Sequence, residues 1–159
     1  MPATRELYEE DFVRWAEAQA TALRRAAAAG SNLPLDWLNL AEEVESLGLS
    51  QRRELRSRLS TLIEHLLKLQ YSNAPDPRAG WIETVGRERR EIELLLEDSP
   101  SLRRELGSLV ALEWSRTAPF VCDLLVERRE MDACDSPDSH APGYAEDQLL
   151  GSWLPDPPR

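Results

Sequence analysis

The apolar positions of this chain recur with the period of an α-helix. The clearest stripe lies between Ser50 and Tyr71, where its members follow one another at steps that place them on one helical face. It consists of Leu55, Leu59, Leu62, Ile63, Leu66 and Leu67. No segment between Leu7 and Arg129 sustains the two-residue alternation typical of a half-buried strand. The pattern therefore predicts an all-α protein.

Five main helices are expected from these stripes and from the turn residues between them. They cover about residues 7–29, 36–48, 50–71, 79–97 and 99–129. Gly30 ends the first helix because glycine readily takes the left-handed backbone conformation, and Gly48 ends the second. Pro119 is expected to kink or interrupt the last helix, since proline cannot donate the helical hydrogen bond.

Short loops between long helices favour antiparallel neighbours, so we expect an up-and-down antiparallel helical bundle. Residues 1–131 are predicted to form this bundle. Residues 132–159 are predicted to be an extended, acidic, proline-rich tail that packs on the bundle or on a neighbouring subunit. The tail is expected to hold one short helix over residues 144–150. Its apolar anchors are Leu149, Leu150, Trp153 and Leu154.

Charge and length limit the class of protein. The 159 residues carry a formal net charge of −10, which disfavours nucleic acid and anionic membranes as partners. Clustered arginines could still contact RNA, but glutamates interleave with them and favour a solvated ion-pair surface. Apolar runs are too short to span a bilayer, and the first residues lack the apolar run of a secretory signal. A bacterial cytoplasmic protein is expected, with Cys122 and Cys134 reduced.

The residues with most chemical interest are polar side chains on or beside apolar stripes. Glu88 and Glu113 interrupt the stripes of the fourth and fifth helices, and His65 lies at the border of the third. Glu43 and Glu45 flank the stripe of the second helix. A buried carboxylate must be paired, protonated or reached by solvent. If these side chains converged, they could form a carboxylate–histidine metal site, with Glu88, Glu113 and His65 as catalytic candidates.

A structural polar layer is the favoured interpretation of the same residues. Di-iron bundles use Glu-x-x-His pairs on two helices, and the helical region contains no such pair. With His65 as the one histidine there, a three-histidine zinc site is excluded. We therefore expect no metal and no cofactor, and we expect Glu88 or Glu113 to be bonded to Arg89, Gln19 or His65.

Several sequence segments resemble one bacterial family. They are Tyr8 to Phe12 with Trp15, Asn39 to Gly48, Ser50 to Tyr71, Trp81 with Arg89 to Ile92, and Leu95 to Leu102. Together they are similar to domain of unknown function 29. The resemblance implies an all-helical bundle and supplies no catalytic residues.

The expected function is that of a small interaction or assembly module that self-associates, most simply as a homodimer. Five tryptophans and the apolar residues of the tail motivate this hypothesis, because exposed aromatic anchors favour association. The alternative is a metal-assisted enzyme that uses the carboxylate–histidine cluster in the bundle core. Sequence favours the non-enzymatic hypothesis without deciding between the two.

Overall fold

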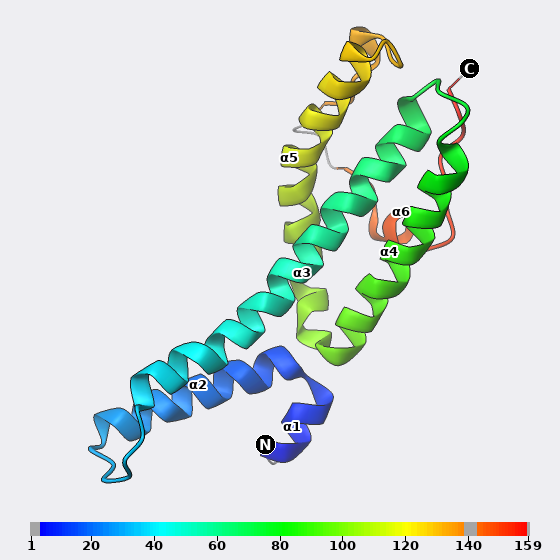
Figure 1. The fold of residues 1–159 in the computed structure, drawn as a ribbon. Coiled ribbons are helices and arrows are strands. Elements are labelled where there is room, and N and C mark those ends of the chain that lie inside the picture. Colours follow the sequence, from blue (N-terminus) through cyan, green and yellow to red (C-terminus); the bar gives the residue numbers. More distant parts are fainter. Residues whose placement is uncertain (1–3, 139–142, 159) are drawn as a thin grey trace. The chain divides into compact units, whose positions relative to one another are not determined.

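The computed structural model describes residues 4–138 and 143–158, and all their regular elements are helical (Figure 1). The elements are α1 (Thr4–Glu10), α2 (Phe12–Ala28), α3 (Trp37–Tyr71), α4 (Arg78–Asp98), the 3-10 helix η1 (Pro100–Arg104), α5 (Leu106–Glu127), the 3-10 helix η2 (Ala133–Asp135) and α6 (Glu146–Leu150). The all-α prediction is confirmed. Among these helices, none is both long and apolar enough to cross a membrane.

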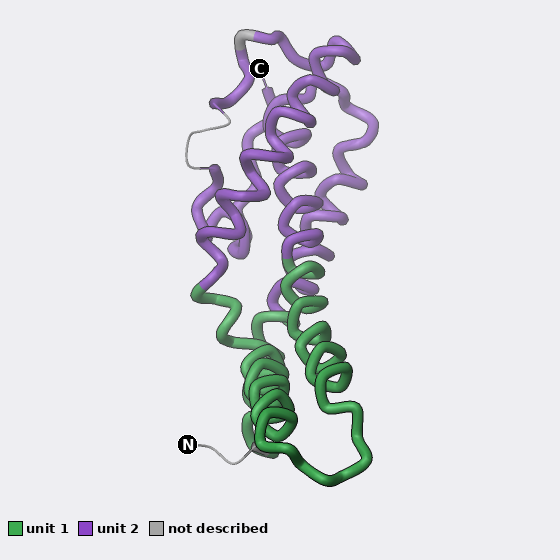
Figure 2. Tube along the Cα trace, turned by 90° about the vertical axis from the view of Figure 1, so that its left-hand side faces the viewer, with its two compact units in different colours: residues 1–55, 94–104 green, residues 56–93, 105–159 purple. Residues whose placement is uncertain are grey.

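The chain forms two compact units, coloured separately in Figure 2. Unit 1 consists of residues 1–55 and 94–104, and unit 2 of residues 56–93 and 105–159. Helices α3 and α4 each contribute one part to each unit. The sequence-based division at residue 131 is a different one and stays a prediction.

The first predicted helix is interrupted at Asp11, which separates α1 from α2. The side chain of Asp11 caps α2 by accepting a hydrogen bond from the Arg14 backbone N–H at 3.0 Å. The same carboxylate accepts the Ser101 backbone N–H at 2.8 Å and the Ser101 hydroxyl at 2.9 Å. At its other end, α2 stops as predicted at Gly30, whose φ is +69°.

Predicted helices two and three are one continuous helix, α3, so the expected stop at Gly48 is wrong. Gly48 is buried against α2, where a Cβ would lie 3.5 Å from the Cβ of Ala16. Ser50 does not cap a new helix, because its hydroxyl donates to the Ser46 carbonyl within the helix at 2.9 Å. Packing against α2 thus overrides the local helix-breaking tendency of glycine.

Helix α5 differs from its prediction at its start and at Pro119. It runs through Pro119 without interruption, whereas residues 100–104 before it form the separate 3-10 helix η1. The loop after α3 and the extent of α4 agree with prediction. The predicted short helix near the C-terminus is α6, which begins two residues later than expected.

The core of unit 2 is built around the apolar stripe of α3. Leu59, Leu62, Ile63, Leu66 and Leu67 are fully buried there. Side chains of α3 contact α4 through Arg58 and Glu88, and α5 through Ser60 and Thr117. Figure 1 shows these three segments side by side within unit 2. This packing brings the predicted polar candidates of α4 and α5 against α3.

Candidate functional site

Glu113 of α5 is a buried carboxylate that forms an ion pair with an arginine. It is 6% exposed, and its Oε1 accepts a hydrogen bond from Nε of Arg56 in α3 at 2.7 Å. Arg116 lies 4.0 Å from the same oxygen. One turn further along both helices, the hydroxyls of Ser60 and Thr117 are 2.9 Å apart. These contacts form a polar layer between α3 and α5.

Glu88 of α4 has an equivalent arrangement with other arginines. It is 5% exposed, and its two oxygens accept hydrogen bonds from Arg58 at 3.3 Å and from Arg87 at 3.4 Å. Arg58 also approaches Glu91 at 3.6 Å. The arginines that donate to the two buried carboxylates are Arg56, Arg58 and Arg87, and not the expected Arg89, Gln19 or His65.

His65 bonds to its own helix and not to either carboxylate. Its Nδ1 lies 2.8 Å from the carbonyl oxygen of Thr61, so Nδ1–H donates to that carbonyl. Nowhere in residues 4–138 or 143–158 do three or more histidine, cysteine, aspartate or glutamate side chains gather closely enough to hold a metal ion. The hydrogen bonds of Glu88 and Glu113 are those of a structural polar layer, and they do not include His65.

The remaining candidates, Glu43 and Glu45, belong to unit 1. Both oxygens of Glu45 accept from the guanidinium of Arg24, at 3.2 and 2.6 Å. This hydrogen bonding lowers the pKa of Glu45. Glu43 is exposed, and its backbone carbonyl accepts from the Ser46 hydroxyl at 2.7 Å. The five candidates are thus divided between the two units, three in unit 2 and two in unit 1.

Arg89 has a role that the sequence did not reveal. Its Nε donates to the carbonyl of Leu149 at 2.7 Å, and its Nη2 donates to the carbonyls of Gln148 at 2.7 Å and Trp153 at 2.6 Å. Burial lowers the pKa of Arg89. One side chain of α4 thereby holds three backbone groups of the C-terminal segment, which we define as residues 143–158.

Aromatic packing fixes the same segment on unit 2. The ring of Tyr144 packs edge-on against Trp114 of α5 at 5.2 Å and lies 5.6 Å from the ring of Trp153. Its hydroxyl donates to Oε1 of Gln70 at 2.7 Å. At position 143 a Cβ would lie 2.6 Å from the Trp114 ring, so only glycine fits this close approach.

The tail residues predicted to lack a partner within the chain have one. Leu149 is 1% exposed, and Leu150 and Trp153 are only partly exposed. Leu154, the fourth anchor, remains 39% exposed. Three of the four anchors are thus wholly or partly covered within the chain, which weakens the reason given for self-association through the tail.

Unit 1 carries a concentration of exposed leucines on residues 33–49, defined here as the leucine-rich segment. It holds six of the twelve large hydrophobic side chains that are exposed in the described parts of the chain. They are Leu33, Leu35, Leu38, Leu40, Leu47 and Leu49, with Leu33 and Leu38 each 62% exposed. The segment has four acidic residues and no basic ones.

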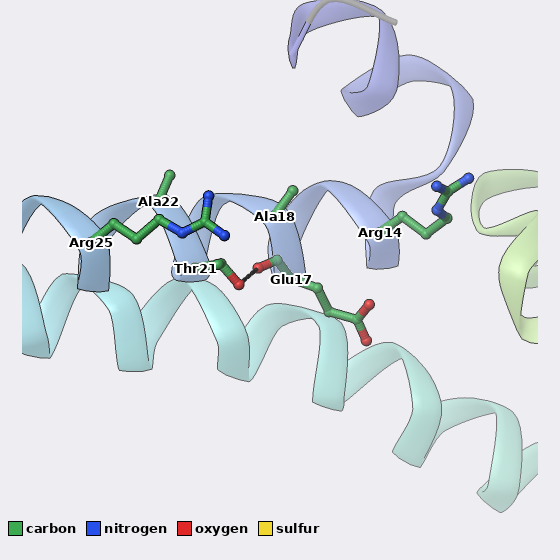
Figure 3. A pocket seen from close by; sticks show the side chains of 6 residues that line it. All are labelled: Arg14, Glu17, Ala18, Thr21, Ala22 and Arg25. Atoms are coloured by element: carbon green, nitrogen blue, oxygen red, sulfur yellow. Dashed lines mark hydrogen bonds between the residues drawn. The ribbon is translucent and has the colours of Figure 1, made fainter. Parts of the chain in front are cut away.

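A shallow cavity of about 570 Å³ lies on α2, also in unit 1 (Figure 3). We call it the α2 hollow; it is lined by Arg14, Glu17, Ala18, Thr21, Ala22 and Arg25. Figure 3 shows Ala18 and Ala22 pointing to the same side of the helix, with Arg14 and Arg25 toward the two ends of the hollow. Glu17 pairs with Arg52 at 2.7 Å, which leaves the hollow itself basic.

Comparisons with other proteins agree with the helical fold. A family model described as "Domain of unknown function DUF29" matches residues 7–139. The chain is similar to a solved alpha-helical protein of unknown function from Rhodospirillum rubrum, with 25% identity and a TM-score of 0.73. That match covers 91% of this chain and 89% of the other. No curated protein matches the chain.

Proposed function

Because the chain belongs to the family described as domain of unknown function DUF29, whose description names no activity, we propose its function from its own surface. It is a protein-interaction module, and two copies associate through unit 1. The leucine-rich segment of one copy occupies the α2 hollow of the other.

The concentration of exposed leucines in one short segment carries this proposal. Isolated apolar side chains are normal on a protein surface, whereas a contiguous group marks an interaction site. Six exposed leucines lie within these 17 residues, whereas the exposed hydrophobic residues of unit 2 are scattered along the chain by comparison. Removing this area from water is the main driving force for association.

Charge complementarity supports a second copy of the chain as the partner. The leucine-rich segment is acidic and carries Glu42 and Glu43 on exposed positions of α3. The α2 hollow is basic, because Arg14 and Arg25 have no ion-pair partner within residues 4–138 and 143–158. Its alanine floor leaves room for leucine side chains. If each copy gives its segment and receives that of the other, the two contacts close into a symmetric dimer.

Charge-reversal variants test this arrangement. In Arg14→Glu/Arg25→Glu, both contacting surfaces become acidic, and in Glu42→Arg/Glu43→Arg both become basic. We expect wild-type protein to sediment at twice the 18.1 kDa monomer mass and each variant alone to sediment as a monomer. Mixing the two variants restores opposite charges at both contacts, so the mixture should again sediment as a dimer.

Apolar variants supply the matched control. Replacing Leu35 and Leu38 with serine should abolish the dimer at micromolar concentration. Phe120→Ser should leave it intact, because Phe120 is 64% exposed but lies in unit 2. A wild-type protein that sediments only as a monomer at micromolar concentration contradicts the proposal. So does a mixture of charge variants that fails to associate.

We also propose the finer fold and location expected from sequence. An up-and-down antiparallel bundle with an acidic tail is supported by the short connections between long helices and by the contacts that join α3, α4 and α5 within unit 2. A bacterial origin is supported by the bacterial source of the similar structure, and a cytoplasmic location is part of the same proposal. Fractionation of cells that express the tagged chain tests the location.

A further inference from the structure

The C-terminal segment rests on three helices of unit 2. Gln70 of α3, Arg89 of α4 and Trp114 of α5 contact it, and all three belong to the same unit as the segment. Figure 1 shows the segment, drawn in orange and red, beside α4. We call the surface that these three side chains form the segment groove.

Arg89 contacts the backbone of the segment and not its side chains. Its guanidinium donates to the carbonyls of Gln148, Leu149 and Trp153. The carbonyls of Gln148 and Leu149 lie in the last turn of α6, where a helix leaves its acceptors unpaired. Across residues 4–138 and 143–158, Arg89 forms no ion pair, so its donors serve the segment alone. An identical segment is held in the same way, whichever copy of the chain supplies it.

Side chains of the segment make this contact selective. Leu149 is 1% exposed, and the Tyr144 ring packs on Trp114 while its hydroxyl donates to Gln70. The ring of Trp153 packs against that of Tyr144. Together with the glycine required at position 143, these residues define the pattern Gly-Tyr-x4-Leu-x3-Trp, which occurs once in the chain. A second copy of the chain therefore carries a matching ligand.

The segment groove lies within the family domain, and the segment does not. Gln70, Arg89 and Trp114 are inside residues 7–139, which the family model matches, whereas the segment follows them in sequence. Fifteen residues, 128–142, connect α5 to the segment. A connection of that length spans at most about 50 Å, which exceeds the diameter of about 30 Å typical of a small domain. Its covalent length thus permits the segment to reach another copy.

We propose that the segment groove binds the C-terminal segment of a second copy of the chain in exchange for its own. The exchanged contact uses the same hydrogen bonds and ring contacts as the intramolecular one, which makes domain swapping a low-cost route to association. A tethered segment competes at an effective concentration on the order of 1 mM. Exchange between wild-type copies at lower concentration therefore rests on the proposed dimer, whereas binding of a free segment to an open groove does not.

A synthetic peptide of residues 143–158 tests whether the groove binds a segment that is not tethered to it. The peptide occupies the groove whenever the chain's own segment opens, so it should accelerate amide hydrogen exchange at Leu149 of the isotope-labelled wild-type chain. At about ten times its Kd for the open groove, the acceleration should be about tenfold. The same peptide with Leu149→Asp should have no effect. No acceleration at about 1 mM peptide, the effective concentration of the tethered segment, would overturn the proposal.

Two full-length variants test exchange between copies. Arg89→Met keeps the segment but removes the main donor of the groove, and Tyr144→Ala/Leu149→Ala keeps the groove but weakens the segment. Neither chain can form the complete contact alone, whereas the segment of the first can dock on the groove of the second. Mixing labelled Arg89→Met with excess unlabelled Tyr144→Ala/Leu149→Ala should slow exchange at Leu149 about tenfold. Both chains also carry Leu35→Ser/Leu38→Ser, so the result does not depend on the contact proposed for unit 1.

The matched control is an unlabelled chain that combines Arg89→Met with Tyr144→Ala/Leu149→Ala, and it should give no protection. Unchanged amide protection in the buried stripe of α3 shows that the variants fold, and the peptide test on the wild-type chain decides the question if they do not. Equal protection from the control chain would overturn the proposal. If the peptide binds but the first mixture gives no protection, exchange between copies is wrong and the groove is assigned to a segment of another protein.

Discussion

Replacement of Arg89 by methionine should release the C-terminal segment from unit 2. Methionine keeps the apolar stem of the side chain but removes the guanidinium. The carbonyls of Gln148, Leu149 and Trp153 then lose the donor that all three share. Leu149 itself is buried, so water does not readily replace the lost hydrogen bonds there.

The size of the effect follows from these three hydrogen bonds. A hydrogen bond to a charged group stabilises a protein by about 1.5–3 kcal/mol when it is well buried. Arg89 is only partly buried, so about 1 kcal/mol for each bond is the better figure. We therefore expect docking of the C-terminal segment to weaken by about 2–4 kcal/mol. A lysine at this position can keep one of the three hydrogen bonds. Arg89→Lys should therefore weaken docking of the C-terminal segment by about half as much as Arg89→Met.

Amide hydrogen exchange measures this docking locally. The backbone N–H groups of Leu149 and Gly151 donate within and just after α6, to Ala145 and Asp147. A loss of 2 kcal/mol corresponds to about 30-fold faster exchange through local opening. Amides in the buried stripe of α3 should change much less, because the perturbation is confined to the docked segment.

Arg90→Met is the matched control, since Arg90 is an exposed neighbour on the same helix. It should leave exchange at Leu149 unchanged. Equal exchange rates of the Leu149 amide in Arg89→Met and Arg90→Met would refute this role of Arg89. So would an equal acceleration of exchange throughout the chain in Arg89→Met.

Three further predictions concern unit 2. Gly143→Ala should destabilise docking by about 1–3 kcal/mol, because the new methyl group overlaps the Trp114 ring, and limited proteolysis should then cleave the C-terminal segment faster. Glu113→Gln should lower the free energy of unfolding by about 1–2 kcal/mol in urea titration, since Arg56 loses its anionic partner but keeps partial access to water. Burial raises the pKa of Tyr144, so the folded protein keeps the phenolic proton at a pH where the unfolded chain loses it. The free energy of unfolding should therefore fall as the pH rises above about 10. In Tyr144→Phe the urea midpoint should decline less steeply between about pH 9 and 11.

The predictions for Gly143 and Glu113 each have a control variant, and the prediction for Tyr144 has an outcome that would contradict it. A Cβ at Gly86 of α4 meets nothing within 4 Å, so Gly86→Ala should be neutral or stabilising. Glu83→Gln removes an exposed charge of α4 in unit 2 and should leave the urea midpoint unchanged. Equal pH dependence in wild type and Tyr144→Phe would show that Tyr144 does not control the alkaline transition.

Sequence periodicity predicts the helices better than their ends. The stripe from Leu55 to Leu67 and the extent of α4 were predictable, because a buried helical face requires apolar residues at fixed spacing. The break at Asp11 and the continuity of α3 through Gly48 were not. Both depend on contacts with segments distant in sequence, Ser101 in the first case and Ala16 in the second.

The same distinction applies to the candidate site. That Glu88 and Glu113 are buried could be predicted from their place on apolar stripes. Their arginine partners could not, because the register between neighbouring helices decides which donor reaches each carboxylate. Arg89 was expected, with Gln19 and His65, among the partners of Glu88 or Glu113, whereas the structure directs it to the C-terminal segment. Hydrogen bonds between side chains of different helices can therefore be identified only from the packed structure.

The hydrogen bonds between Asp11 and Ser101 join residues that are 90 positions apart in the chain. During synthesis on the ribosome, α1 and α2 therefore emerge long before the segment that completes their packing. Closing so long a loop is entropically costly, and native contacts at this separation are associated with slow folding. The N-terminal helices can complete these contacts only after η1 has been synthesised. A nascent chain that ends before residue 94 therefore lacks residues 94–104, which belong to unit 1.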